Sequence, residues 1–138
     1  MQKSHFLDLP SQCNDYVILN EETRNTGYSG HSSSTCDNSL DDSIWYRMMP
    51  PAGTMIPEEV VSKYRCGSNV VGWMDGVHPK ILGENVVRKV CFHWDSNHCL
   101  WSKNIDVTNC GEYYVYKLPI VPTCNTRYCA TYKGNFFL

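Results

Sequence analysis

The sequence predicts a small, β-dominated domain held together by disulfide bonds. The chain of 138 residues contains eight cysteines, an even number, and no two of them form a C-x-x-C pair. This spacing lacks the commonest zinc-binding signatures and favours disulfides formed in an oxidising compartment. In addition, short β-branched and aromatic runs recur along the chain, whereas no segment keeps helical periodicity over several turns.

The predicted strands are short runs of β-branched and aromatic residues, and turn residues close several of them. They cover residues 16–19, 44–49, 70–74, 86–94, 100–107 and 113–118. Pro50-Pro51 follows the second run, Asp75-Gly76 the third and Pro119 the last. Residues 25–35 are rich in Ser, Thr, Asn and Gly, so a loop is expected there.

Two of these runs form a C-terminal hairpin in this prediction. They are VVRKVCFHW (86–94) and LWSKNIDV (100–107), joined by Asp95-Ser96-Asn97-His98. At most one short helix is expected, at 57–64, because Pro57 is followed by two acids, which suit a helix start. The predicted class is therefore a disulfide-bonded all-β domain with several short strands.

One domain is expected for a chain of this length, and we place it at 13–129, with an N-terminal tail at 1–12 and a C-terminal tail at 130–138. The opening residues, MQKSHFLDLP, contain no apolar signal-peptide core. No stretch of about 20 apolar residues occurs that could span a membrane. Given the cysteines, we expect a secreted or extracellular protein whose signal peptide lies outside this chain.

The charge of the chain argues against nucleic-acid binding. Net charge is −2, the sequence pI is about 6.2, and no long run of basic residues occurs. No glycine-rich phosphate loop is present, and no cofactor is expected.

The densest cluster of potential ligands contains Cys91, His93, His98 and Cys99. One interpretation is a hairpin bridged at its base by a Cys91–Cys99 disulfide, with both histidines as incidental polar residues. The alternative is a structural or catalytic metal site, because Cys91 and His93 share one face of the expected strand. The metal site requires free thiols, so the oxidation state of the cysteines separates the two hypotheses.

Other catalytic and metal-binding patterns are weak. No G-x-S-x-G nucleophile elbow occurs, and an even cysteine count leaves no unpaired thiol, so an enzyme is not expected. Asp37, Asp41 and Asp42 suggest a calcium loop, but Asp42 stands where such a loop needs glycine and Met48 where it needs glutamate. A solvated acidic loop is the preferred interpretation.

Aromatic residues are abundant, and two interpretations are open for them. Large rings can supply most of a small core, or they can form an exposed platform for a sugar or a protein. On the predicted strand at 113–118, Tyr114 and Tyr116 point opposite to Tyr113 and Val115, which leaves room for an exposed aromatic face. Core packing is the default expectation for these rings, which are Trp45, Trp73, Trp94, Trp101, Tyr46, Tyr113, Tyr114 and Tyr116.

A series of short motifs resembles a known family. The motifs are CDNSL at 36–40, WYR at 45–47, AG at 52–53, CG at 66–67, GWMDGVHP at 72–79, VRKVC at 87–91, Trp94, CLW at 99–101, YYVYKL at 113–118 and PTC at 122–124. In order and spacing they resemble the eight-cysteine domain of uromodulin and of the pancreatic zymogen-granule membrane glycoprotein. The likeness runs from about Cys13 to Cys129, nearly the whole chain.

The resemblance implies how the cysteines pair. The implied disulfides are Cys13–Cys110, Cys36–Cys124, Cys66–Cys129 and Cys91–Cys99. Val60 and His98 stand at the positions of two further cysteines in uromodulin's version of the domain. The resemblance therefore weakens the metal hypothesis, because His98 occupies a vacated cysteine position.

The resemblance also implies a function. It indicates a non-enzymatic extracellular interaction or scaffold module, alone or as a fragment of a larger secreted mosaic protein. The expected partner is an extracellular protein or a carbohydrate, and the sequence does not identify the residues that bind it. The chain contains no N-x-S/T glycosylation sequon.

Overall fold

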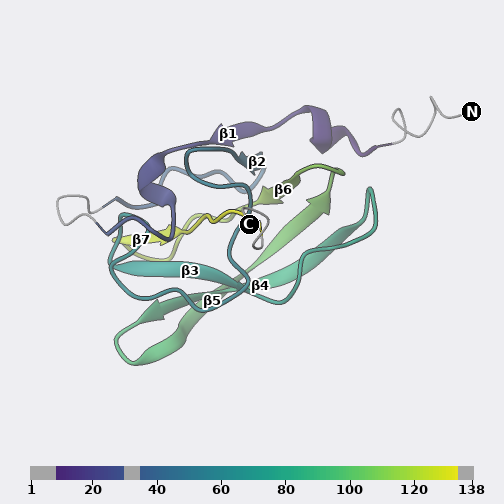
Figure 1. Ribbon diagram of the computed structural model, residues 1–138. Coiled ribbons are helices and arrows are strands. Elements are labelled where there is room, and N and C mark those ends of the chain that lie inside the picture. Colours follow the sequence, from purple (N-terminus) through teal and green to yellow (C-terminus); the bar gives the residue numbers. More distant parts are fainter. Residues whose placement is uncertain (1–8, 30–34, 134–138) are drawn as a thin grey trace, which may run out of the picture.

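The structure, a computed structural model, describes residues 9–29 and 35–133, and its main element is one seven-stranded mixed sheet (Figure 1). The strands are β1 (Val17–Leu19), β2 (Trp45–Met48), β3 (Val70–Asp75), β4 (Asn85–Trp94), β5 (Asn97–Asn109), β6 (Tyr114–Lys117) and β7 (Thr126–Tyr128). Two short 3₁₀ helices, η1 (Ser11–Asn14) and η2 (Glu22–Arg24), lie near the start of the described chain. The predicted β-dominated class is confirmed.

The strand order across the sheet is β1-β2-β6-β5-β4-β3-β7. The two outermost pairs, β1 with β2 and β3 with β7, are parallel, and the pairs between them are antiparallel. All of the predicted strands are present. The sequence does not predict β7, because this strand is three residues long, fully buried and centred on the charged Arg127, so it shows no alternating pattern.

Strands β4 and β5 form a long hairpin that runs from one end of the molecule to the other (Figure 1). Trp94 pairs with Asn97, so the connection is the tight turn Asp95-Ser96, shorter than predicted. Asp95 has a φ of 58°, a left-handed conformation that Asp adopts more readily than most residues. Because Asp95 tolerates this conformation, the turn is tight, and β5 begins three residues earlier than the sequence pattern indicates.

The segment 57–64, where the sequence allows a short helix, is irregular. Its carbonyl groups bond to neighbouring strands and not to the next helical turn. The carbonyl of Pro57 accepts a hydrogen bond from the amide of Met74 (2.8 Å). The carbonyl of Val61 accepts one from Nδ1 of His93 (2.6 Å). A single helical turn is costly to nucleate, so these contacts with the sheet determine the conformation.

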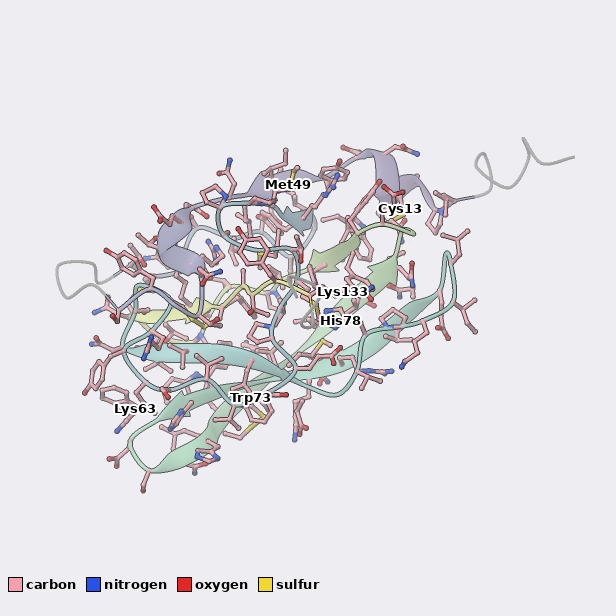
Figure 2. The ribbon with its side chains drawn as sticks, in the orientation of Figure 1. Cys13, Met49, Lys63, Trp73, His78 and Lys133 are labelled. Carbon is pink, nitrogen blue, oxygen red and sulfur yellow. A yellow bond between two sulfur atoms is a disulfide. The ribbon has the colours of Figure 1, made fainter. Side chains whose placement is uncertain are left out.

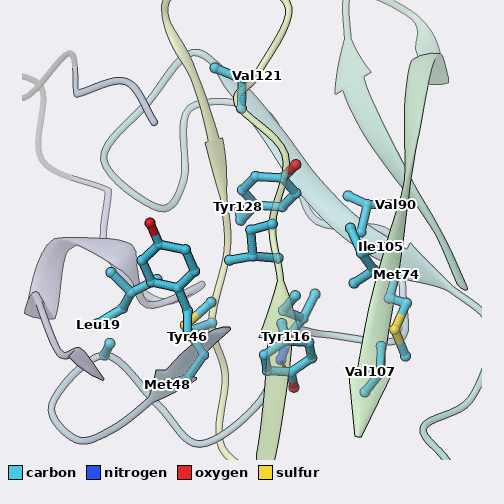
Figure 3. Packing of buried hydrophobic residues seen from close by; sticks show 14 of the residues in the cluster. Leu19, Tyr46, Met48, Met74, Val90, Ile105, Val107, Tyr116, Val121 and Tyr128 are labelled. Carbon is cyan, nitrogen blue, oxygen red and sulfur yellow. Dashed lines mark hydrogen bonds between the residues drawn. The ribbon is translucent and has the colours of Figure 1, made fainter. Parts of the chain in front are cut away.

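The main core lies on one face of the sheet, where alternate side chains of the strands meet. Figure 3 shows Tyr116 and Tyr128 in this cluster with Met74, Ile105 and Val107. Loop residues, among them the fully buried Ala52 and Ile56, also belong to the cluster. The aromatic rings therefore provide much of the volume of the core, as expected for a small domain.

The opposite face is covered by two smaller clusters. Near η1, the Cys13–Cys110 disulfide packs with Val115 and with the half-buried Tyr113. The second cluster contains the Cys66–Cys129 disulfide. Both faces of β6 are therefore covered, because its other two rings pack in or against the main core. This arrangement favours the core interpretation of the β6 tyrosines, while the four tryptophans are half-buried.

Four disulfides include every cysteine of the chain. They join Cys13 to Cys110, Cys36 to Cys124, Cys66 to Cys129 and Cys91 to Cys99. The first three link residues 97, 88 and 63 positions apart, and the fourth links residues 8 apart. The long-range bonds fasten the segments around the sheet, whereas the short one lies within the β4–β5 hairpin.

The loop predicted at 25–35 is partly described, and its start is anchored. Asn25 bridges to Ala130, and its side-chain amide donates a hydrogen bond to the carbonyl of Ala52 (2.8 Å). Residues 30–34 of this loop, and residues 1–8 and 134–138 of the predicted tails, lie outside the described residues. Within the described stretches, no helix has the length and apolar character needed to cross a membrane.

Candidate functional site

The Cys91/His93/His98/Cys99 cluster does not form the metal site considered above. Cys91 and Cys99 are bonded to each other. The Nδ1 of His93 donates to the carbonyl of Val61, while the ring of His98 lies 4.8 Å from that of His93 between centroids and is exposed. Because both sulfur atoms are bonded in a disulfide, neither cysteine can be a thiolate ligand, and the hypothesis of a metal site with these four ligands is wrong. Across residues 9–29 and 35–133, no three His, Cys, Asp or Glu side chains are grouped as metal ligands would be.

Two aspartates of the predicted acidic loop, Asp37 and Asp41, have separate roles. Asp37 is buried and accepts two hydrogen bonds from the guanidinium of Arg24, at 2.7 and 3.1 Å. It also accepts one from the amide of Tyr128 (2.8 Å). Asp41 is exposed and bonds to Ser43, so its pKa is lowered by these hydrogen bonds. Asp37 is therefore a structural ion-pair partner and not a member of a solvated loop.

A second buried polar group is His78, which lies between a carboxylate and a phenol. Its Nδ1 is 2.5 Å from Oε2 of Glu58, and its Nε2 is 2.8 Å from the hydroxyl of Tyr116. The amide of His78 donates to the same Oε2 (2.8 Å), and the amide of Ile56 donates to the Tyr116 hydroxyl (3.0 Å). The ring of Tyr114 packs on the imidazole with centroids 4.3 Å apart. Figure 2 shows His78 near the middle of the molecule.

These contacts fit a neutral imidazole that carries its proton on Nδ1. The Nδ1–H then donates to Glu58, and the Tyr116 O–H donates to Nε2. Burial lowers the pKa of His78, the contacts with Glu58 oppose this effect, and the cations of Arg88 and Lys133 add to it. The pKa of Tyr116 is raised, chiefly by burial, so its hydroxyl remains a donor.

Glu58 connects this buried group to the surface. Burial raises the pKa of its carboxyl, but the two hydrogen bonds from His78, with smaller effects of the positive charge of His78 when it is protonated and of Lys80, outweigh burial and lower the pKa below its usual value. Its side chain is 31% exposed. Both hydrogen bonds from His78 go to Oε2, and Oε1 has no partner within the described part of the chain. Glu58 is thus an ionised, oriented carboxylate with one free oxygen.

Glu58 lines an open groove of about 620 Å³, a volume within the usual range of about 300–1,000 Å³ for ligand sites. The groove lies between the irregular segment 55–62 and the chain at Thr131 and Tyr132. Its apolar wall consists of Met55, Pro57, Val60, Val61 and Tyr132. Its charged side chains are Glu58, Glu59 and Arg65. This groove is the candidate binding site.

Sequence reasoning did not identify this groove. Glu58 and Glu59 were expected at the start of a helix, and Tyr132 in a tail. His78 was noted only within the GWMDGVHP motif. The groove is formed by three segments that lie far apart in the chain, at Thr26, at 55–65 and at 131–132, so no local sequence pattern predicts it. The histidine that follows a turn in that motif is the one local signal, because such a polar residue needs partners when it is buried.

The fold and the site define a class of protein: a disulfide-bonded extracellular β domain whose cysteines are all paired and whose surface bears a ligand-sized groove. The family model described as "Uromodulin-like, D8C domain" matches residues 46–130. The chain belongs to this family.

Individual relatives agree with this assignment. The pancreatic secretory granule membrane major glycoprotein GP2 of Mus musculus is 38% identical over 122 residues, which cover 85% of this chain and 22% of the relative. Uromodulin of Rattus norvegicus is 38% identical over 118 residues, which cover 85% of this chain and 18% of the relative. The chain thus spans about a fifth of the length of these curated relatives. It is a secreted or extracellular uromodulin-like module.

Proposed function

We propose that this chain is a non-enzymatic interaction module that binds an extracellular protein or carbohydrate in the groove beside Glu58. The observation that carries the proposal is that Glu58, whose carboxylate is oriented by two hydrogen bonds from His78, lines a groove of ligand size. Preorganised polar groups in a concave, partly apolar site are typical of ligand recognition. We place the module at residues 13–129, between its first and last cysteines.

The chemistry of the described residues supports binding over catalysis. Every cysteine is in a disulfide, so no thiolate is available as a nucleophile. Both ring nitrogens of His78 are engaged, with Glu58 and with the buried Tyr116, so this imidazole has no lone pair or proton to offer a substrate. A group held in this way positions its neighbours, as a scaffold does.

The test is a screen of the purified, fully oxidised protein against arrays of extracellular proteins and of glycans. Any hit is then measured with Val60→Arg, which places a bulky cation at an exposed position of the groove wall. Ile81→Arg is the matched control, because Ile81 is also an exposed aliphatic residue but does not line the groove.

We expect Val60→Arg to abolish binding and Ile81→Arg to leave it intact. Equal effects of the two variants would move the binding site away from the groove. If the wild-type protein bound nothing on either array, the chain would be a structural spacer and the proposal would fail.

A further inference from the structure

The free oxygen of Glu58 is the starting point for assigning a class of ligand. Oε2 already accepts two hydrogen bonds from His78, so only Oε1 is available to a ligand. With one free oxygen, the carboxylate does not offer the two parallel acceptors of a bidentate pair, so a ligand bonds to it through Oε1 alone. It is suited to a single strong, charge-assisted hydrogen bond from a cation.

The residues of the groove wall favour a ligand side chain that has a long apolar stem and a charged end. Aliphatic side chains (Met55, Pro57, Val60, Val61) and the ring of Tyr132 border the charged positions of the groove. Three hydroxyl residues, Thr26, Ser62 and Thr131, also line it, but no asparagine or glutamine side chain does, although amides commonly recognise sugar hydroxyls. Lysine and arginine bury their methylene stems against apolar surfaces and extend the charged head to a carboxylate.

The balance of charge in the groove also favours a cationic ligand side chain. Two carboxylates line it, those of Glu58 and Glu59, against the single guanidinium of Arg65. Arg65 is itself turned towards the carbonyl of Gly27 (3.5 Å). Tyr132 also lines the groove and is 38% exposed, and an aromatic ring attracts a cation placed over its face. The groove is therefore complementary to a positive side chain.

We propose that the groove receives a lysine or arginine side chain of an extracellular protein ligand, with the charged head at Oε1 of Glu58 and the stem along the wall formed by Val60 and Tyr132. This assignment rests on the function proposed above and specifies the chemistry of the same site. A neutral carbohydrate is the competing ligand class, and the experiment separates the two.

The experiment is NMR titration of the isotope-labelled, fully oxidised full chain with small probes. The cationic probes are the acetylated and amidated tripeptides Gly-Lys-Gly and Gly-Arg-Gly. Gly-norleucine-Gly, which has a similar stem and no charge, is the neutral control, and maltotriose is the carbohydrate probe. We expect saturable shifts of groove amides, among them those of Val60 and Tyr132, with the cationic probes only.

Glu58→Gln tests the carboxylate without removing its support, because the amide oxygen can still accept both hydrogen bonds from His78 while the charge is lost. We expect this variant to bind the cationic tripeptides roughly tenfold more weakly. The matched control is Glu84→Gln, since Glu84 does not line the groove and its side chain has no hydrogen bond or ion pair in the described chain. Tyr132→Ala tests the wall separately, should Glu58→Gln fold poorly.

Three results would overturn the assignment: no groove shifts with the cationic probes, equal affinity in wild type and Glu58→Gln, or groove shifts with maltotriose alone. If array binding at the groove persists in any of these cases, the interaction module stands and only the ligand class is wrong. If array binding is also absent, both proposals fall.

Discussion

Among individual residues, Arg24 and Asp37 carry the strongest structural constraint. Their side chains are 2% and 5% exposed, and they meet through two hydrogen bonds. The Asp37 carboxylate also holds the amide of Tyr128, and Arg24 donates to the carbonyl of the same residue (3.0 Å). One ion pair therefore connects η2, the loop before β2 and the edge strand β7.

Asp37→Asn should destabilise the domain strongly. The amide oxygen can still accept a hydrogen bond, but the buried guanidinium of Arg24 loses its nearest carboxylate and keeps only that of the more exposed Glu21, at 3.2 Å. Breaking a buried pair in this way costs about 3 kcal/mol or more of the free energy of unfolding. Urea unfolding of the oxidised protein measures the loss. Asp42→Asn, at an exposed position, should change the value little; similar losses for both variants would contradict the structural role of the ion pair.

The stability of the domain should fall as the pH drops below about 6.5, because of His78. In the folded state burial lowers the pKa of His78, with Arg88 and Lys133 acting in the same direction and Glu58 opposing them, while Tyr114 and Tyr116 pack against the ring as neutral phenols. The unfolded chain therefore binds a proton that the folded chain resists. The contribution of His78 to the stability is fully present above its pKa in the unfolded chain. It is lost as the pH falls from there towards its pKa in the folded protein.

Urea unfolding at pH 7.5, 6.5 and 5.5 tests this expectation, at values above the range in which Glu58 should contribute. His78→Gln should lower the stability at every pH and flatten its dependence on pH. His98→Gln, at an exposed imidazole, serves as the control and should keep the wild-type slope. A wild-type slope in His78→Gln would show that another group is responsible.

At the scale of the elements, the β4–β5 hairpin organises the sheet, because each of its strands pairs along its outer side with a further strand. Its disulfide, Cys91–Cys99, closes a loop of only 8 positions, whereas Cys13–Cys110 closes one of 97. The hairpin is already closed by the turn at Asp95-Ser96 and by its ladder of hydrogen bonds. A disulfide acts mainly by restricting the unfolded chain, where this ladder is absent, so the short loop limits how much chain entropy Cys91–Cys99 removes.

Removing the two disulfides should accordingly have unequal effects. In the chain-entropy model, replacing Cys91 and Cys99 by alanine costs about 2.6 kcal/mol, and replacing Cys13 and Cys110 costs about 4.7 kcal/mol. Denaturant unfolding of the two double-alanine variants, side by side, provides the measurement. A larger loss for the hairpin variant would mean that this disulfide also fixes the register of β4 and β5.

At the scale of the whole molecule, three long-range disulfides connect distant segments of the chain around a core of modest size. Three disulfides connect the first third of the chain or the middle loop to the last third. The sheet itself places β7 beside β3 and β6 beside β2, pairs that are far apart in sequence. The fold thus depends on contacts that an unfolded chain must close across many residues, and the covalent bonds reduce that cost.

Intact mass measured with and without reduction should differ by two hydrogens for each of the four disulfides, about 8 Da in all. A non-reducing peptide map should return the four pairs found in the structure. After reduction we expect the far-UV circular dichroism of the sheet and the cooperative unfolding transition to be lost. Free thiols in freshly prepared protein would contradict this expectation and the assigned compartment.

The sequence by itself determined the features that depend on local patterns or on composition. Alternating β-branched and aromatic runs predicted every strand except β7, and the paired number of cysteines predicted an oxidised domain. Turn dipeptides such as Asp75-Gly76 marked strand ends, because turns need particular backbone conformations that few residues supply. These signals act over a few residues, so they can be read without the fold.

Only the tertiary structure decided where distant segments meet. It converted the segment 57–64 from an expected helix into a groove wall, because Pro57 and Val61 bond to strands that follow later in the chain. It also buried Asp37 against Arg24, and it placed Glu58 on His78 and Tyr116. Each of these contacts depends on the desolvation and pairing of groups far apart in sequence, and the energy of such pairing exists only once the chain has folded.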